Sequence, residues 1–261
     1  MLIKIESSDN NRIKTVRKLR TKKGRDEESK IVIEGINLVS EAVTRGISID
    51  FIMASDRFDG GSFLADCINS EHLMVCMIPD DVMNKIADAE NGVGILAVID
   101  KASIEHGEDS IDSDSNVLVL DRVQDPGNIG TMIRTAVAAG YSRIYAIKGT
   151  ADVYSPKVLR ATAGMIFDIP VTYVQDAREL RTTLDRFGKK IVVTTVDGGK
   201  PYYDENLSSG VALVIGNEGN GVSDEILEIA DVRVTIPMKG EIESLNAAVS
   251  AAILMYETIR K

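Results

Sequence analysis

The sequence predicts an α/β protein built from two domains that an acidic segment separates. Short apolar runs typical of buried strands alternate along the chain with segments of helical periodicity. The alternation stops at EHGEDSIDSD, residues 105–114, which contain five acidic residues and no lysine or arginine. A segment of this composition is expected to be a solvated linker. We therefore divide the chain into an N-terminal domain of residues 1–103, a linker of residues 104–115 and a C-terminal domain of residues 116–261.

The N-terminal domain begins with a helical pattern and continues as strands and helices. Residues 12–23 place Ile13, Val16 and Leu19 on one face, which predicts one amphipathic helix. The apolar runs IVIE, FIMAS, LMVCMI and GILAVI then predict strands, the first of which passes into a helix. A further helix is predicted over residues 79–89.

The C-terminal domain repeats this rhythm. The runs NVLVL, RIYAI, IVVTTV, VALVI and VRVTI predict strands. Helices are predicted over residues 129–139, with Asn128 as the N-cap, and over residues 224–230, with Ser223 as the N-cap. A long C-terminal helix is predicted to run to Arg260. The last helix carries one apolar stripe, formed by Leu245, Val249, Ala252, Ile253 and Tyr256.

Composition places the chain among soluble globular proteins. Hydrophobic residues make up 44% of its 261 residues and charged residues 27%. The longest apolar stretch, residues 247–255, falls short of the ~20 residues that a membrane-spanning helix needs. The N-terminus shows no secretory signal. We therefore expect a cytoplasmic protein with no membrane partner.

Cysteine and histidine usage excludes several function classes. Cys67 and Cys76 are too few for a disulfide framework and form no C-x-x-C pair. Neither His72 nor His106 has a second ligand at metal-binding spacing. A zinc enzyme, a Ser-His-Asp hydrolase and a bound metal are therefore not expected.

The charge is distributed unevenly along the chain. The net charge is −10, which by itself argues against a nucleic-acid partner. Residues 1–30, however, hold ten basic and five acidic residues, a net charge of +5, whereas the remainder holds 20 basic and 35 acidic residues, a net charge of −15. Such a basic segment either steers RNA to the protein or is the solvated face of a helix.

Three loops of the C-terminal domain are rich in glycine, asparagine and glutamate: residues 121–130, 216–223 and 237–246. Each follows a predicted strand, and loops at the carboxyl ends of parallel strands share the edge where ligands bind. The glycines of the second loop are spaced G-x-x-G-x-G, which differs from the dinucleotide-binding fingerprint and disfavours a nicotinamide oxidoreductase. For any one loop taken alone, an ordinary strand-to-helix turn explains the composition.

Individual side chains in these loops are candidates for chemistry. Arg134 lies four residues after Gly130 on the same helical face, so its guanidinium is expected over an open loop; an exposed arginine with a surface partner is the alternative. Glu218 is held on glycine-rich backbone that a ligand approaches closely, or it stabilises a turn. Ser244 and Asn246 stand where a helix begins, and either is able to cap it.

Together the three loops resemble the three signature motifs of the SpoU/TrmH-type RNA ribose 2′-O-methyltransferases. The first motif resembles residues 125–130 with Arg134-Thr135-Ala136, the second residues 215–221, and the third Ile236-Pro237-Met238 with residues 244–248. The segment SPKV with RATAG between them, residues 155–164, is similar to another family segment. The resemblance covers residues 116–260, and the N-terminal region looks like the small α/β substrate-binding domain that often precedes this catalytic domain.

The resemblance implies a fold, a cofactor and an assembly. It implies a SPOUT-type α/β catalytic domain with a parallel sheet and a deep trefoil knot around S-adenosyl-L-methionine. It also implies a homodimer, with the knot region and the apolar stripe of the last helix at the interface. RNA is the implied partner, bound by the basic N-terminal residues Arg12, Lys14, Arg17, Lys18, Arg20, Lys22 and Lys23 and by Arg134.

The resemblance also assigns residue roles. The implied catalytic residues are Asn128, Arg134, Glu218, Ser244 and Asn246. The implied cofactor-binding residues are Thr195, Gly216, Asn217, Gly221, Ile236, Met238, Ser244 and Leu245. Because a guanidinium scarcely deprotonates, we expect Arg134 to bind the adjacent phosphate and stabilise the developing alkoxide rather than to act as a base.

The expected activity is transfer of a methyl group from S-adenosylmethionine to an RNA ribose 2′-hydroxyl. The two-domain layout favours large-subunit rRNA as the substrate. A tRNA substrate and a non-catalytic RNA-binding relative are the alternatives.

Overall fold

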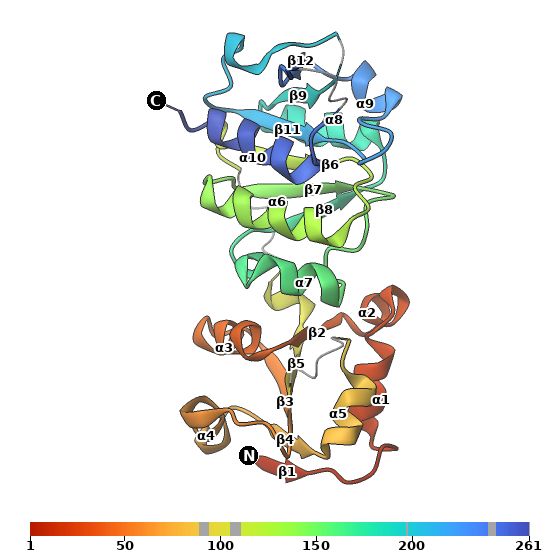
Figure 1. The fold of residues 1–261 in the computed structure, drawn as a ribbon, viewed down its shortest axis with the longest axis vertical. Coiled ribbons are helices and arrows are strands. Elements are labelled where there is room, and N and C mark those ends of the chain that lie inside the picture. Colours follow the sequence, from red (N-terminus) through yellow and green to blue (C-terminus); the bar gives the residue numbers. More distant parts are fainter. Residues whose placement is uncertain (89–93, 105–110, 197, 240–243, 261) are drawn as a thin grey trace. The chain divides into compact units, whose positions relative to one another are not determined.

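The computed structural model describes residues 1–88, 94–104, 111–196, 198–239 and 244–260 (Figure 1). The chain forms two compact units. The first comprises Met1–His106 and Tyr154–Phe167, and the second comprises Gly107–Val153 and Asp168–Lys261. Tyr154–Phe167, which the sequence analysis placed in the C-terminal domain, thus groups with the first unit. Residues 105–110 of the expected linker lie outside the described residues.

The first unit is built on a mixed five-stranded sheet with the order β1-β4-β3-β5-β2. Strands β1, β4 and β3 are parallel, whereas β5 runs antiparallel to both β3 and β2. The strand bounds are β1 Leu2–Lys4, β2 Lys30–Glu34, β3 Ile49–Ser55, β4 Val75–Ile78 and β5 Ile95–Asp100. The four predicted strands are present, and β1 is an additional one, too short for its sequence to show alternation.

Helices flank this sheet. They are α1 Asn11–Lys18, α2 Lys22–Glu28, α3 Ile36–Thr44, α4 Gly61–Asn69, α5 Asp80–Ile86 and α7 Pro156–Thr162, with short 3₁₀ turns at Lys101–Ser103 and Met165–Phe167. The helix predicted over residues 79–89 is the shorter α5, and its expected last residue, Ala89, lies outside the described residues.

The prediction of one helix over residues 12–23 is wrong. The chain turns after Lys18, and Thr21 starts α2 by accepting a hydrogen bond at its Oγ1 from the Gly24 amide, at 3.1 Å. A Cβ on Gly24 would lie 2.0 Å from the Lys18 carbonyl oxygen, so only glycine allows so tight a turn. The inward face is nevertheless as predicted, because Ile13, Val16 and Leu19 are fully buried.

A charge cluster around the buried Glu34 holds α7 within the first unit. Arg160 donates hydrogen bonds to Glu34 Oε2, at 2.9 Å, and to Asp88 Oδ2, at 2.8 Å. The Glu34 side chain is completely buried, and its other oxygen pairs with Arg20. This pairing of a buried carboxylate with two guanidiniums satisfies charges that would otherwise be costly to bury.

The second unit is built on a seven-stranded sheet with the order β10-β12-β9-β11-β6-β7-β8, in which all neighbouring strands pair in parallel. The bounds are β6 Val117–Leu120, β7 Arg143–Ile147, β8 Val171–Val174, β9 Lys190–Thr194, β10 Lys200–Pro201, β11 Val211–Ile215 and β12 Val232–Thr235. All residues of β6, β7 and β11 are buried, as expected for central strands covered on both faces. The predicted α/β fold with a parallel sheet is thus confirmed.

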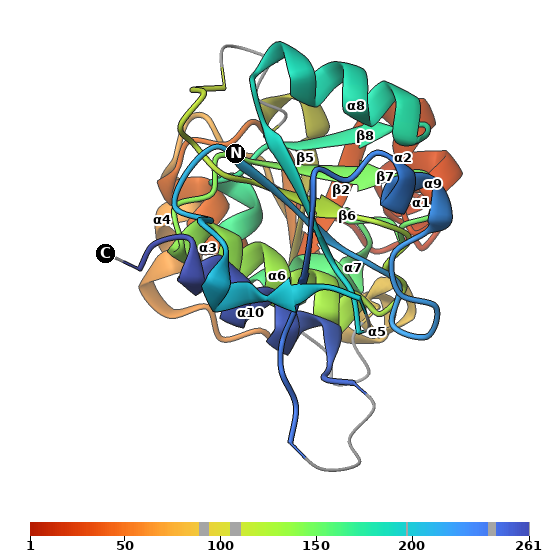
Figure 2. The same ribbon diagram turned by 90° about the horizontal axis from the view of Figure 1, so that it is seen from above.

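The helices of the second unit are α6 Pro126–Ala138, α8 Ala177–Arg186, α9 Asp224–Glu228 and α10 Ala247–Glu257, with a 3₁₀ turn at Tyr202–Asp204. Helices α6 and α10 pack together on one face of the sheet, and α8 covers the other (Figure 2). In the part of the chain that the structure describes, no helix is both long enough and apolar enough to cross a membrane.

Helix α6 starts earlier than predicted. Its N-cap is Asp125, whose Oδ1 accepts a hydrogen bond from the Asn128 amide at 2.8 Å, and Pro126 occupies the first turn. The prediction that Asn128 caps this helix is therefore wrong. The consequence is functional, because the Asn128 side chain is left for a contact with another loop.

Candidate active site

The first and second glycine-containing loops are joined by one carboxylate. Glu218 Oε2 accepts a hydrogen bond from the Gln124 amide at 3.0 Å, and Oε1 accepts hydrogen bonds from the Asp125 amide at 2.9 Å and from Asn128 Nδ2 at 3.1 Å. Three donors of the β6–α6 loop and the first turn of α6 thus converge on a side chain that follows β11. The prediction that these loops cluster at the carboxyl edge of the sheet is confirmed.

Asn128 extends this contact to the third loop. Its Oδ1 accepts a hydrogen bond from Asn246 Nδ2 at 2.9 Å. Asn246 in turn caps α10, because its Oδ1 accepts hydrogen bonds from the Ala248 and Val249 amides at 2.9 and 3.3 Å. Three residues from three separate motifs therefore form a continuous chain of hydrogen bonds, in which Asn128 must both donate and accept.

The hydrogen bonds to Glu218 control its ionisation. Partial burial raises the pKa of the Glu218 carboxyl, but the amides of Gln124 and Asp125 and the side chain of Asn128 outweigh it, and the pKa lies below its ordinary value of 4.5. Glu218 is therefore a carboxylate at neutral pH with three donors on its two oxygens. Such a group is a weak base, so we regard Glu218 as a residue that holds the loops in place.

Replacing this carboxylate should change how stability depends on pH. Because the pKa is depressed in the folded state, the stabilisation is present above the unfolded value near 4.5 and is lost as the pH falls through the folded value. We expect Glu218→Gln to melt at a lower temperature than the parent protein at pH 7, and the difference to narrow below pH 4.5. Calorimetry from pH 7 to pH 3 measures it; a difference that stays constant over this range contradicts the assignment.

The side-chain amide of Asn128 should be essential for stability, so that a carboxylate in its place destabilises the protein. Asn128→Asp removes the donor to Glu218 and places two carboxylates against each other, so we expect the free energy of unfolding to fall by about 1–3 kcal/mol. Urea unfolding at pH 7 measures this loss. Asn246→Asp is the matched control, because it keeps the oxygen that caps α10 and loses only the donor to Asn128. An Asn128→Asp protein as stable as the parent would contradict the hydrogen-bond chain.

A cavity of about 590 Å³ lies beside this chain of hydrogen bonds, between the loops that follow β9, β11 and β12. All eight residues expected to bind the cofactor line it: Thr195, Gly216, Asn217, Gly221, Ile236, Met238, Ser244 and Leu245. Glu218 lines it too. Residues 240–243 of the third loop lie outside the described residues.

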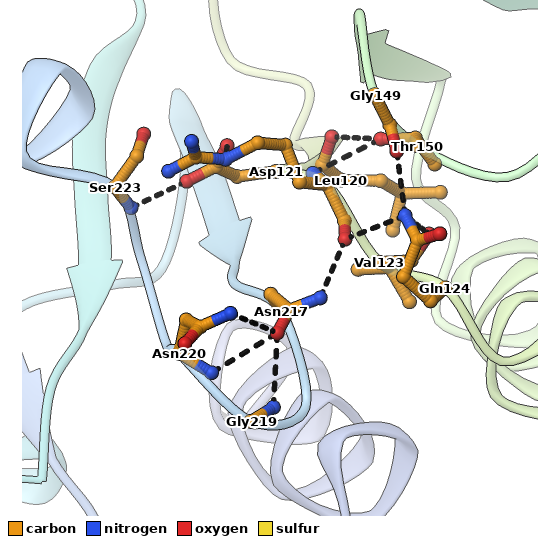
Figure 3. Close-up of polar contacts among 11 residues, drawn as sticks. Leu120, Asp121, Val123, Gln124, Gly149, Thr150, Asn217, Gly219, Asn220 and Ser223 are labelled. Atoms are coloured by element: carbon orange, nitrogen blue, oxygen red, sulfur yellow. Dashed lines mark hydrogen bonds and ion pairs between the residues drawn. The ribbon is translucent and has the colours of Figure 1, made fainter.

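The backbone of the second loop is folded tightly against this cavity. Asn217 and Gly221 exchange two amide-to-carbonyl hydrogen bonds, both 2.9 Å, and a Cβ on Gly216 would lie 2.2 Å from the Gly221 carbonyl carbon. Asn217 Oδ1 accepts hydrogen bonds from the Gly219 and Asn220 amides, both at 3.0 Å (Figure 3). The Asn217 side chain therefore shapes the loop, which leaves backbone to contact a ligand.

One buried polar atom at the cavity has no partner. Thr195 Oγ1 is inaccessible to solvent and makes no hydrogen bond with any described residue. Leaving a buried hydroxyl unpaired is unfavourable, so this atom favours a polar ligand in the cavity. The residues present thus fit S-adenosylmethionine, which would be held by backbone near Thr195, Gly216, Ile236 and Leu245.

The side chain of Arg134 is exposed on α6 and, among the described residues, makes no hydrogen bond or ion pair. The alternative prediction, that a surface partner holds Arg134, therefore finds no support among the described residues. Gly130 is buried, however, so the expected open space at that position is filled. Ser244 is exposed and lines the cofactor cavity, whereas the capping role expected of either Ser244 or Asn246 belongs to Asn246.

The basic N-terminal residues already have local contacts. The guanidinium of Arg12 lies 6.0 Å from the ring centroid of Phe51, Lys14 is 3.9 Å from Asp9, and Arg17 contacts the Ser8 carbonyl at 3.5 Å. These contacts are long and at the surface.

Of the remaining members of the basic segment, Lys18 and Arg20 make closer contacts than these. Lys18 pairs with Glu27 and Glu28, Lys23 lies 3.8 Å from Glu27, and Lys22 also has an interaction. Arg20 differs from all of them, because it pairs with the buried Glu34 and its side chain is only 19% exposed. Arg20 therefore belongs to the interior of its unit.

Sequence reasoning missed the residues that shape the first loop from below. Thr150 Oγ1 donates to the Leu120 carbonyl at 2.9 Å and accepts from the Arg122 amide at 3.1 Å (Figure 3). The buried Asp121 accepts a hydrogen bond from the Ser223 amide at 2.6 Å. An aspartate directly after a wholly apolar strand was the available signal for Asp121; Thr150 lies in an unpatterned turn and gave none.

The comparisons with known proteins agree with this geometry. The sequence model of the SpoU rRNA methylase family matches residues 115–256, and that of an MRM3-like substrate binding domain matches residues 10–97. This chain belongs to the SpoU rRNA methylase family. The predicted family, the methyltransferase activity and the S-adenosylmethionine cofactor are confirmed.

Similarity to individual members of the SpoU rRNA methylase family extends over nearly the whole chain. The chain is 37% identical to the Bacillus subtilis 23S rRNA (guanosine(2553)-2′-O)-methyltransferase RlmP, over 97% of both chains. It is 27% identical to the Streptomyces viridochromogenes 23S rRNA (uridine(2479)-2′-O)-methyltransferase, over 91% of this chain and 85% of that one. The crystal structure of an S-adenosylmethionine-bound rRNA methyltransferase from Sinorhizobium meliloti superimposes with a TM-score of 0.85 at 30% identity, over 98% of this chain and 97% of that one.

Proposed function

We propose that the protein methylates the 2′-hydroxyl of a ribose in large-subunit rRNA. The observation that carries the proposal is the hydrogen-bond chain from Glu218 through Asn128 to Asn246, which brings the three motifs together beside the cofactor cavity. Bound S-adenosylmethionine supplies an electrophilic methyl group on a positively charged sulfur. The protein's own task is to align the ribose hydroxyl with that methyl group and to stabilise the charge that develops as its proton leaves.

Arg134 is suited to the second part of that task. Its guanidinium stays protonated at any working pH, so it acts as a cation and not as a base. Its side chain is exposed and unpaired among the described residues, which leaves its donors for the RNA. In this assignment Arg134 binds the phosphate next to the target ribose and stabilises the negative charge of the developing alkoxide. Ser244 completes the site from the cavity wall.

Two observations favour rRNA over tRNA. The first unit matches a substrate-binding domain model, and both named enzymes to which the chain is similar over 91% or more of its length act on 23S rRNA. The exposed cations of the basic segment, Lys14, Arg17, Lys18, Lys22 and Lys23, together with the half-buried Arg12, would contact the rRNA backbone. Such a substrate implies that the enzyme acts in the cytoplasm.

The face of α10 that points away from the core supports a homodimer. Of the predicted apolar stripe, Val249 is 48% exposed and Tyr256 53%, whereas Ala251, Leu254 and Met255 of the same helix are buried. This exposed stripe is the one that the family's dimer would cover, next to the proposed trefoil knot. We expect light scattering to give the mass of a dimer and Val249→Asp to give that of a monomer; a monomeric parent protein would contradict the proposal.

The substrate is tested with unmodified RNA. Purified protein is incubated with labelled S-adenosylmethionine and separate pools of large-subunit rRNA, small-subunit rRNA and tRNA that lack the modification. We expect label in the large-subunit pool alone. Label confined to tRNA would contradict the proposed substrate, and binding of cofactor and RNA without transfer would identify a non-catalytic relative.

A further inference from the structure

A second cavity of the second unit, of about 560 Å³, is not used by the site described above. It opens at the carboxyl ends of β6, β7 and β8, against α8 and α9. Four cationic residues line it; Arg181 is paired with two aspartates, and the other three are Arg122, Lys148 and Arg178. One residue separates Arg122 from the end of β6, and Lys148 directly follows β7. Both residues therefore lie at the carboxyl edge of the parallel sheet, where ligands bind. No function derived above involves these three residues.

Arg122 is held in a strained conformation by several independent contacts. Its φ is +58°, in the left-handed region that residues other than glycine rarely adopt. Its carbonyl oxygen accepts hydrogen bonds from Asn217 Nδ2 at 2.9 Å and Gln124 Nε2 at 3.1 Å, and its amide donates to Thr150 Oγ1. Strain maintained by surrounding structure in this way is typical of functional positions.

Contacts with neighbouring residues also fix the position of the Arg122 side chain. Arg122 Nε lies 3.4 Å from the buried Asp121 Oδ1, which makes no hydrogen bond of its own. The stem runs over Gly149, where a Cβ would lie 3.1 Å from Arg122 Cγ. The two terminal nitrogens of Arg122 have no partner among the described residues, and its side chain is 46% exposed. The guanidinium is thus fixed through one nitrogen and presents the other two.

The neighbouring cations are similarly available. The side chains of Lys148 and Arg178 are exposed and make no hydrogen bond or ion pair with any described residue. Arg181 also lines the cavity but is neutralised by Asp185 and Asp231. Four acidic residues line the cavity as well: Asp121, Asp176, Glu225 and Glu228. An anion is therefore attracted only close to the three free cations.

We propose that Arg122, Lys148 and Arg178 bind a backbone phosphate of the RNA substrate a short distance along the strand from the target ribose. Planar guanidinium groups and an ammonium converging on one cavity are the recognition chemistry of phosphate. The loop that carries Arg122 continues into Gln124, Asp125 and Asn128. A phosphate bound to Arg122 would therefore fix the position of the RNA strand relative to the catalytic loop. This inference rests on the proposed RNA substrate and adds an RNA-binding site on the catalytic unit, whose acidic surroundings otherwise repel RNA.

The test measures RNA binding by fluorescence anisotropy as a function of salt, in Arg122→Asn, Lys148→Gln and Arg178→Gln. Asparagine tolerates the left-handed region, so Arg122→Asn removes the charge with little added strain. We expect each variant to weaken RNA binding about ten-fold and to reduce the slope of log K against log salt by about 0.7. KM for RNA should rise, with kcat and cofactor affinity unchanged.

Arg186→Gln is the matched control, since it removes an exposed positive charge from the same helix at a residue outside the cavity. We expect it to leave the salt slope unchanged. Equal slopes in all four variants and the parent protein would overturn the proposal, and so would loss of cofactor binding in Arg122→Asn with no effect of Lys148→Gln and Arg178→Gln. Anisotropy reports RNA binding whether or not methyl is transferred, so failure of the proposed reaction would be seen separately.

Discussion

Arg134→Ala should lower kcat/KM for methyl transfer by about 10²–10³-fold while the protein stays folded. Removing one preorganised donor from a developing oxyanion typically has an effect of this size. The fold should not respond, because the Arg134 side chain is exposed and makes no hydrogen bond or ion pair with the described residues. Initial rates with labelled S-adenosylmethionine, together with thermal melting, measure both quantities.

Arg134→Lys separates the two contributions of the guanidinium. It keeps the positive charge but loses the planar pair of donors, so we expect its activity to fall between those of Arg134→Ala and the parent protein. Cofactor affinity, measured by calorimetry, should be the same in all three proteins. Full activity in Arg134→Ala would remove Arg134 from both of its proposed roles.

Gly216→Ala should abolish cofactor binding and destabilise the second unit. The added Cβ would lie 2.2 Å from the Gly221 carbonyl carbon and 2.3 Å from the Val222 nitrogen. These are backbone atoms of the same loop, which move only if the Asn217–Gly221 hydrogen bonds break. We expect a loss of about 1–3 kcal/mol in the free energy of unfolding, typical of forced overpacking. Urea unfolding and calorimetric titration with S-adenosylmethionine are the measurements.

Gly219→Ala is the control for this prediction, because it adds the same methyl group to the same loop. Its Cβ would meet only Asn217 Oδ1, at 3.7 Å, which is an ordinary contact. We expect its unfolding free energy to match that of the parent protein within about 0.5 kcal/mol. Equal behaviour of the two alanine variants would show that the close approach at Gly216 does not shape the cofactor cavity.

Much of the fold could be predicted because its strands carry strong local patterns. The apolar runs that became β6, β7 and β11 are buried on both faces, and such strands are nearly continuous in sequence. Strand β8 escaped prediction because its VTYV mixes buried and half-buried positions. The break between α1 and α2 escaped because it depends on a close approach of Gly24 to the Lys18 carbonyl, which has no periodic signature.

The sequence predicted which residues form the candidate site better than it predicted the contacts among them. The glycine-rich loops and their strand ends sufficed to place Glu218, Asn128 and Asn246 near one another. The direct contacts among them were not predicted. The sequence analysis assigned Asn128 to the N-cap of the helix, and in that role its side chain would bond the helix backbone instead of Glu218 and Asn246. Asp125 takes that position instead, as the N-cap before Pro126. The contacts of Thr150 depend on tertiary structure alone.

The central claim is that a methyl group is transferred to a ribose 2′-hydroxyl, and alkaline hydrolysis of the labelled RNA product tests it most directly. Alkali cleaves RNA through the 2′-hydroxyl, so a methylated ribose protects the linkage that follows it. We predict that, after complete hydrolysis, all label is recovered in a single alkali-resistant dinucleotide, and that about 10²–10³-fold less appears with Arg134→Ala protein in the same time. Label recovered in mononucleotides would place the methyl group on a base and contradict the account.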